Sequence, residues 1–214
     1  SASLSKGAAV MRSFVKDNLK LYLDFKSTKS DTLKFPCEGS TYFDGNDDYI
    51  EIADNSDLDI GTSDMTITAW VNAEEETGLS KYIVNKMHSS VGYEFGIATN
   101  EKTFLVLNDG STDYYIYSND TITYGKWHHL AVTWNSTTNK ALPYIDGVQS
   151  SSGEHDGTVG TLANSGVLRL GCNASALNYE LKGNMANVGI WSRALSAEEV
   201  NSVMRKNYSQ LKSV

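Results

Sequence analysis

Apolar and polar residues alternate along most of this chain, in short runs that predict β-strands. The clearest run is residues 128–134, where Leu130, Val132 and Trp134 share one face of an extended segment and the residues between them share the other. The extended pattern resumes over residues 141–145, after a run of Asn, Ser and Thr that favours a turn. The sequence therefore predicts two strands joined by a turn at this point.

The same alternation recurs along most of the chain. The expected strands are residues 19–25, 41–43, 49–52, 65–71, 82–86, 93–98, 103–107, 113–118, 128–134, 141–145, 148–152, 167–172 and 185–191. With only two prolines, the turns between them rely on Asn, Asp, Ser and the 17 glycines. Strands at this spacing predict an all-β fold, a two-sheet antiparallel jelly-roll sandwich.

The two ends of the chain depart from the strand pattern. Residues 1–18 place their apolar side chains at helical spacing, which predicts an arm containing a short helix. Ser196 is followed three residues later by Glu199, a capping-box pattern that predicts a helix start. We therefore expect an arm, a sandwich over 19–195, and a helix with a tail over 196–214 that packs on the sandwich.

Charge separates the arm from the rest of the chain. The net charge of -8 argues against a nucleic-acid partner, since phosphate binding needs a dense basic face. The first 20 residues nevertheless carry four basic side chains and one acidic one. A basic arm on an acidic body predicts docking onto a protein partner or a neighbouring copy, with Arg12, Phe14 and Lys16 as contact residues; a solvated terminus is the alternative.

Two further features concern cellular context. Cys37 and Cys172 leave one disulfide open as an alternative, because two cysteines are not the dense pattern of small secreted domains. The chain has no apolar run long enough for membrane insertion, and its first residues lack the apolar core of a signal peptide. If the protein works outside a cell, we expect earlier processing or release by another route, such as lysis with a virus particle.

The central hairpin also carries a family resemblance. Residues 127–135, W-H-H-L-A-V-T-W-N, followed by Y-I-D-G, resemble the central hairpin of laminin-G-like domains in the concanavalin A-like lectin and glucanase superfamily. The resemblance continues in order from Y-F-D-G-N-D-D-Y-I-E-I at 42–52 to L-K-G-N-M-A-N-V-G-I-W-S-R-A-L-S-A-E-E-V at 181–200. It implies the same jelly-roll fold, in a superfamily that contains binding proteins, enzymes and structural modules.

The catalytic pattern of the glucanase members is missing. Those relatives carry E-x-D-x-x-E or E-x-D-x-E on one strand, which places two carboxyl groups about 5 to 5.5 Å apart, and neither motif occurs here. His128 and His129 are adjacent in a predicted strand, so their side chains point to opposite faces. No serine stands in a nucleophile-elbow pattern. We therefore expect a protein that is not an enzyme.

Two acidic loops are candidates for Ca²⁺, which takes six to eight oxygen ligands. The first places Asp44, Asp47 and Asp48 after the strand at 41–43. The second is residues 54–59, which contain three Asp and one Asn. Laminin-G-like sequences often carry an acidic pair in the penultimate strand, where this chain has Ala and Asn at residues 186–187, so that metal role is not carried over.

Aromatic and polar residues around 113–118 form a candidate glycan site. Sugar binding needs aromatic platforms for the ring faces and amide or carboxylate partners for the hydroxyls. Tyr115 and Tyr117 share a strand face with Asp113, and Asn108 lies close in sequence. The same residues also suit sheet packing or a protein interface.

Two functions from different classes stay open. Residues 15–25, V-K-D-N-L-K-L-Y-L-D-F, look like the start of laminin-G-like domains in tailed-phage virion proteins. That resemblance implies a non-enzymatic structural protein on a virion surface, either a capsid decoration or a tail-associated protein, with a capsid or tail protein as partner. The alternative is a carbohydrate-binding, lectin-like module at a virion or extracellular surface, with or without Ca²⁺.

Overall fold

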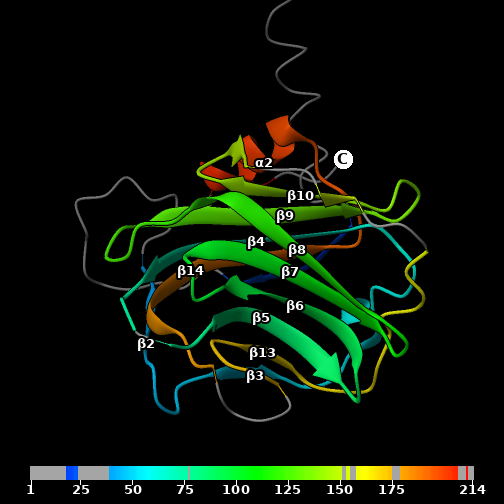
Figure 1. The fold of residues 1–214 in the computed structure, drawn as a ribbon, viewed down its shortest axis with the longest axis horizontal. Coiled ribbons are helices and arrows are strands. Elements are labelled where there is room, and N and C mark those ends of the chain that lie inside the picture. The colour runs from blue at the N-terminus through cyan, green and yellow to red at the C-terminus, as the bar shows by residue number, and fades with distance from the viewer. Residues whose placement is uncertain are drawn as a thin grey trace, which may run out of the picture.

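The protein is a sandwich of two antiparallel sheets, seen in a computed structural model (Figure 1). The structure describes residues 18–23, 39–76, 78–150, 153–154, 158–174, 179–206 and 211. The strands are β1 (Leu19–Leu23), β2 (Thr41–Asp44), β3 (Ile50–Ile52), β4 (Met65–Ala73), β5 (Lys81–His88), β6 (Val91–Ile97), β7 (Lys102–Asp109), β8 (Asp113–Thr121), β9 (His128–Asn135), β10 (Lys140–Ile145), β11 (Val148–Gln149), β12 (Gly153–Glu154), β13 (Leu168–Leu170) and β14 (Lys182–Trp191). The all-β prediction is confirmed.

The eight-stranded sheet runs in the order β1-β14-β4-β9-β10-β11, with β2 also paired to β14 and β12 to β10. The central hairpin expected from the sequence is β9 and β10, which pair antiparallel from Asn135 opposite Lys140 to Leu130 opposite Ile145. The hairpin lies beside β4, whose Ile67 is opposite Val132.

The six-stranded sheet runs in the order β3-β13-β5-β6-β7-β8, and these strands lie side by side in Figure 1. Strands β2 and β3 are separated by one short turn in sequence, yet β2 pairs with β14 and β3 with β13. The turn after Asp44 therefore crosses from one sheet to the other.

The core lies between the sheets and consists of their inward-facing apolar side chains. In β4, Met65, Ile67 and Val71 point inward and are buried, as their alternation predicts. Thr66 and Thr68, on the outward face of the same strand, are buried as well. The eight-stranded sheet must therefore be covered on its outer side.

The cover is α2 (Ala197–Met204), which lies over β9 and β10 in Figure 1. Ser196 and Glu199 form the predicted capping box, with both reciprocal hydrogen bonds present. The helix packs Val200 and Val203 against a cluster that includes Trp191. A short 3₁₀ helix, η2 (Ser56–Leu58), begins at Asn55, whose side chain accepts a hydrogen bond from the Asp57 amide.

Several sequence-based predictions fall on residues that the structure does not describe. Arg12, Phe14 and Lys16 of the expected arm lie outside the described residues, as does Cys37. Cys172 is a buried free thiol, and burial raises its pKa to about 11. Within the described part of the chain, no helix is both long and apolar enough to cross a membrane.

Candidate functional site

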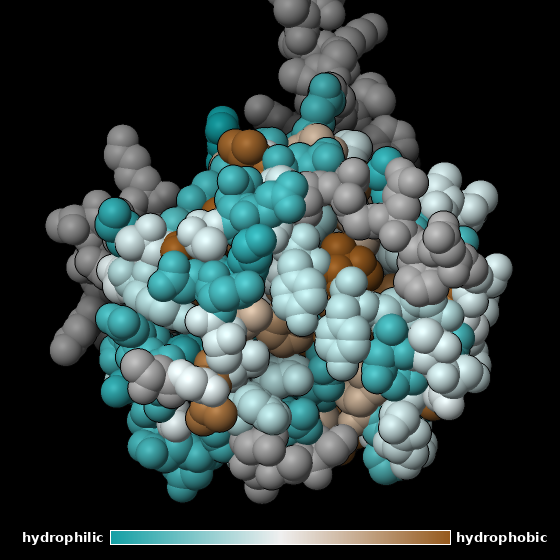
Figure 2. Space-filling view, in the orientation of Figure 1, coloured by the Kyte–Doolittle hydropathy of each residue, from teal (hydrophilic) through white to brown (hydrophobic). Residues whose placement is uncertain are grey.

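The outer face of the six-stranded sheet is uncovered by any helix of the described residues and collects tyrosines. Side chains opposite one another in neighbouring strands share a face, and the register groups the outward residues of β5 to β8. We call this set the tyrosine face: Tyr82, Asn85, Met87, Gly92, Glu94, Gly96, Phe104, Val106, Asn108, Asp113, Tyr115 and Tyr117. Figure 2 shows apolar side chains in hollows between more hydrophilic ones in the middle of the view, where β6 to β8 run in Figure 1.

Tyr115 and Tyr117 are the most exposed aromatic side chains of this face, at 57% and 45%. Their ring centroids are 6.5 Å apart and the ring planes differ by only 9°. That separation is about the two-residue repeat of a strand, roughly 6.6 Å. The alternation of β8 alone therefore sets two parallel rings beside each other, and both are open to solvent.

The rings continue across the sheet as an aromatic row: Tyr115, Tyr117, Phe104, Tyr82 and Tyr179. Phe104 lies 6.4 Å from Tyr117 and 5.4 Å from Tyr82, centroid to centroid, and Tyr82 lies 5.5 Å from Tyr179. Gly96 makes room for the middle of the row, because a Cβ there would lie 2.7 Å from the Phe104 ring.

Glu94 stands beside the aromatic row and is only 8% exposed. Its Oε1 accepts a hydrogen bond of 2.9 Å from the Asn85 side-chain amide, and the Tyr82 side chain also bonds to it. Burial raises the pKa of the Glu94 carboxyl, and the negative charge of Asp113 raises it further. Burial and the Glu94 charge raise the pKa of Tyr82, whereas the hydrogen bond from Tyr82 lowers the pKa of Glu94 and offsets part of the effect of burial.

Asn108 and Asp113 lie at the other end of the same face. The Asn108 side-chain amide donates to Oδ1 of Asp113, and its oxygen accepts from the Gly110 amide at 2.7 Å. The four ligand residues predicted from the sequence, Asn108, Asp113, Tyr115 and Tyr117, thus lie together on the tyrosine face. The sequence pattern did not identify four further residues of this face: Tyr82, Asn85, Glu94 and Phe104. The available signal was that Asn85 and Glu94 are polar residues in otherwise apolar strands.

Arg169 is the basic residue that the register places beside this face, opposite Asn85. Its Nε and Nη2 lie 3.0 and 2.9 Å from Glu51, and its Nη1 donates to the carbonyl oxygens of Asn173 and Ala174. The guanidinium also lies over the Tyr49 ring, 4.9 Å from the centroid. Its donors are therefore engaged by the edge of the sheet.

The first acidic loop brings its three predicted metal ligands together. Asp44, Asp47 and Asp48 each have a carboxylate oxygen within 4.8 Å of the others. Oδ1 of Asp44 accepts from the Asn46 amide at 2.8 Å, and this hydrogen bond is the main reason that the pKa of Asp44 is lowered. The three carboxylates lie close together, which suits Ca²⁺; the site stays a prediction.

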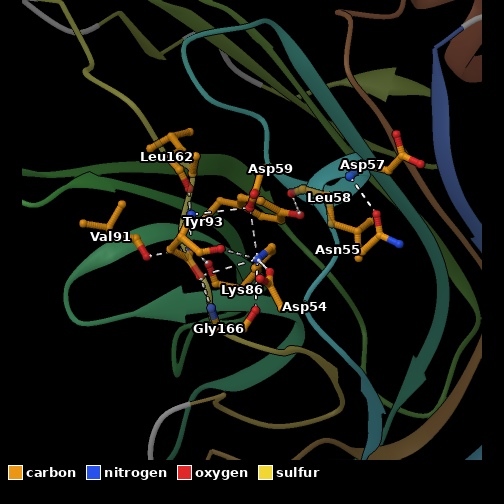
Figure 3. Close-up of polar contacts among 12 residues, drawn as sticks. Asp54, Asn55, Asp57, Leu58, Asp59, Lys86, Val91, Tyr93, Leu162 and Gly166 are labelled. Atoms are coloured by element: carbon orange, nitrogen blue, oxygen red, sulfur yellow. Dashed lines mark hydrogen bonds and ion pairs between the residues drawn. The ribbon is translucent and has the colours of Figure 1, made fainter.

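The second acidic loop is bound by a lysine instead. Nζ of Lys86, which is fully buried, lies 3.0 Å from Asp54 and 3.2 Å from Asp59, and donates to the Gly166 carbonyl at 3.0 Å. Figure 3 shows Lys86 at the centre of these contacts. Asn164 joins the cluster by donating to the backbone of β5 and β6. The lysine charge takes the place that a cation would have at this loop, so residues 54–59 form an ion-pair cluster.

The two histidines point to opposite faces, as predicted. His128 accepts from the Thr123 amide at Nε2, so its Nδ1 carries the proton and donates to Asp146 at 2.8 Å. His129 is buried, packs against Trp70, and has no hydrogen-bond partner at Nδ1. Burial lowers the pKa of His129 to about 4. Both histidines serve the framework of the sandwich.

Comparison with known proteins agrees with this architecture. The model of a laminin-G type family, described as the concanavalin A-like lectin/glucanases superfamily, matches residues 44–201. The chain belongs to this superfamily. Among curated relatives, neuronal pentraxin-1 of Homo sapiens is 28% identical over 146 residues, which cover 64% of this chain. The match covers 32% of the pentraxin, so the chain spans about a third of that relative's length.

Solved structures of other members of this fold cover most of the chain. A carbohydrate-binding domain, CBM40 of the Ruminococcus gnavus IT-sialidase, superposes with a TM-score of 0.65 at 10% identity, covering 87% of this chain and 99% of that one. The receptor-binding domain of botulinum neurotoxin mosaic serotype C/D gives 0.68 at 15% identity, covering 89% of this chain and 51% of that one. At these identities the likeness shows the fold alone.

Proposed function

We propose that this superfamily member is a non-enzymatic, carbohydrate-binding module that holds a glycan on the tyrosine face. The observation that carries the proposal is the aromatic row, in which two parallel, exposed tyrosine rings stand beside buried carboxylate and amide groups. Tyr115 and Tyr117 supply flat apolar surfaces for the faces of sugar rings. Glu94 and Asp113 accept hydrogen bonds from sugar hydroxyls, which fix orientation.

The comparisons support binding as the activity. The CBM40 structure is described as bound to α2,3 sialyllactose. A further neighbour, with a TM-score of 0.64, is described by the dependence of botulinum neurotoxin type C cell entry on two ganglioside molecules. Sialyllactose is a glycan and a ganglioside is a lipid with a glycan headgroup, and cell entry begins outside the cell. We therefore place this chain's activity at an extracellular surface as part of the same proposal.

The test is glycan binding by the full chain and by a double variant, Tyr115→Ala with Tyr117→Ala. A glycan array identifies the ligand, and titration calorimetry measures its affinity. Loss of the two exposed rings is expected to weaken binding by tenfold or more, about 1.4 kcal/mol, since aromatic contacts contribute roughly 0.5–1.5 kcal/mol each.

The matched control is Tyr42→Ala. Tyr42 is equally exposed but lies on β2, in the other sheet, so its removal should leave the affinity unchanged. The proposal is wrong if the chain binds no glycan of the array. It is also wrong if the double variant binds as tightly as the unmodified chain.

The finer hypothesis of a virion component rests on the resemblance of residues 15–25 to tailed-phage laminin-G-like domains. It stays a prediction, together with a capsid or tail partner and self-association through the arm. Stoichiometric copies of the chain in a purified particle would support it. Light scattering of the full chain and of a version lacking residues 1–18 tests whether the arm holds copies together.

A further inference from the structure

The tyrosine face is negatively charged where its aromatic rings gather. Glu94 and Asp113 act on the same tyrosine: burial raises the pKa of Tyr115, and the charges of Asp113 and Glu94 raise it further. The register places Arg169 two strands away from Glu94, and its donors are engaged by Glu51 and two carbonyl oxygens. Lys102 begins β7 four residues before Val106, the residue opposite Glu94, which is roughly 13 Å along a strand.

Glu94 is a buried carboxylate, and none of the residues that the structure describes gives it a basic partner. Buried carboxylates are normally paired with a cation, because a desolvated charge is costly. Here the hydrogen bonds come from the neutral Asn85 amide and the Tyr82 side chain. A carboxylate has about four acceptor positions, so two donors leave capacity for a ligand. A ligand that uses this capacity must bring a donor group, neutral or positively charged.

Glu94 is flanked on the outward face of β6 by Gly92 and Gly96. The Phe104 ring lies over Gly96 and the Asn164 side-chain amide lies beside Gly92, so a ligand reaches Glu94 only at the 8% of this residue that stays exposed. Val106, opposite Glu94 on β7, is the small residue between Glu94 and Tyr115. A sugar stacked on Tyr115 or Tyr117 would thus have its polar groups next to Glu94 and Asp113.

We infer that the tyrosine face, if it binds glycans as proposed above, selects neutral and amino sugars and rejects sialylated, uronic-acid and sulfated ones. Glu94 determines this specificity by accepting hydrogen bonds from hydroxyl or ammonium groups. An anionic sugar group close to Glu94 meets a like charge in a partly desolvated site, where repulsion is stronger than in water.

The test compares matched pairs on one glycan array, followed by calorimetry. The pairs are lactose with 3′-sialyllactose, and N-acetylchitotriose with its deacetylated, amine-bearing trimer. We expect the neutral member of the first pair to bind about tenfold more tightly than the acidic one, and the amine-bearing trimer to bind more tightly than its acetylated form. Both differences should shrink on going from 20 to 300 mM NaCl, as ionic strength screens the charges.

The deciding variant is Glu94→Gln, which keeps the shape and one acceptor oxygen. It is expected to bring both ratios within about twofold of unity. Glu198→Gln, on the exposed face of α2, removes the same charge elsewhere and should leave the ratios unchanged. Asp113→Asn provides a second, exposed site for the same test, with a smaller loss of discrimination, if the Glu94 variant does not fold.

The outcomes separate this inference from the proposed function. Binding of acidic glycans as tightly as their neutral partners overturns the charge selection and leaves carbohydrate binding intact. Charge selection that survives both variants overturns the role of these two carboxylates. Absence of binding to every glycan on the array overturns carbohydrate binding itself, and the inference with it.

Discussion

The two sheets of the sandwich have outer faces with the same alternation but opposite surroundings. On the eight-stranded sheet, Trp191 is buried against α2, and His129 is buried beside Trp70. On the six-stranded sheet, Tyr115 and Tyr117 point the same way relative to their strand and stay exposed. Aromatic residues stabilise the fold on the first face and are available to a ligand on the second.

The hydrogen-bond partners of polar side chains also differ between the two outer faces. On the covered face, Oγ1 of Thr66 donates to the Arg193 carbonyl and accepts from the Leu195 amide, so its capacity is used by the segment that leads into α2. On the tyrosine face, Asn85 and Glu94 bond to each other and are also buried. Polar side chains are therefore satisfied by a covering segment on the first face and by one another on the second.

The largest expected effect is the difference in stability loss between substitutions on the two outer faces. Trp191→Ala should destabilise the protein by about 3–5 kcal/mol, because it leaves a cavity between β14 and α2. Tyr115→Ala should change stability by less than about 0.5 kcal/mol, as surface substitutions usually do. Urea denaturation measures both. Similar losses for the two variants would show that the tyrosine face is also a packing surface.

The second effect is a pH dependence that belongs to the covered face. The pKa of His129 falls from 6.5 unfolded to about 4 folded, so the unfolded chain binds more protons between these values. Stability is then fully present above pH 6.5 and declines as the pH falls towards 4, by roughly 3 kcal/mol at 1.36 kcal/mol per pH unit. Denaturation series at pH 7 and pH 4.5 measure the decline.

His129→Leu removes the titrating group and should flatten the pH dependence between 6.5 and 4. The comparison with the unmodified chain isolates His129 from carboxylates that protonate at lower pH. An equally steep decline in the variant would assign the pH dependence to other groups.

The third effect is the change in thermal stability on adding calcium, which should distinguish the two acidic loops. At a calcium concentration ten times the Kd, binding adds about 1.4 kcal/mol, which corresponds to a Tm rise of roughly 3–6 °C for a chain of this size. Asp47→Asn with Asp48→Asn should abolish the rise. Asp54→Asn should lower the Tm with and without calcium, because it weakens the Lys86 cluster, and leave the rise intact. Equal Tm values in calcium and in chelator would rule out the site.

The smallest effect is the pH dependence of stability that comes from Glu94, and its sign is opposite to that from His129. The folded pKa of Glu94 is raised above its unfolded value, so the folded protein binds more protons in that interval and stability falls as the pH rises through it. Glu94→Gln is therefore expected to stabilise the protein at pH 7 by less than about 1 kcal/mol while it weakens charge selection. Destabilisation by the variant at pH 7 would make Glu94 a structural residue.

Alternation along the chain was sufficient to predict the sandwich, most strands and the shared face of the exposed candidate residues. Tyr115, Tyr117 and Asp113 share one strand, and a period of two places them on one face without any knowledge of partners. The capping box likewise identified α2 from residues within one turn. Predictions that depend on neighbours in sequence were the ones that the structure confirmed.

The rest depended on strand register, which local sequence does not contain. Glu94 joins Asn85 because β5 and β6 pair with one bulge between Tyr82 and Val84, and a shift of one residue would send Glu94 into the core. Asp54 and Asp59 looked equivalent to the first acidic loop until Lys86, more than 25 residues away in sequence, was found between them.

The glycines of β6 limit how the site can be altered by mutation. A Cβ at Gly92 or Gly96 would lie 1.9 or 2.3 Å from a carbonyl oxygen of β5, so these two positions admit no other side chain without moving the backbone. The outward positions of β8, at the edge of the sheet, already carry exposed side chains. A library that seeks new ligand preferences should therefore randomise Asp113, Tyr115 and Tyr117 and hold β6 constant.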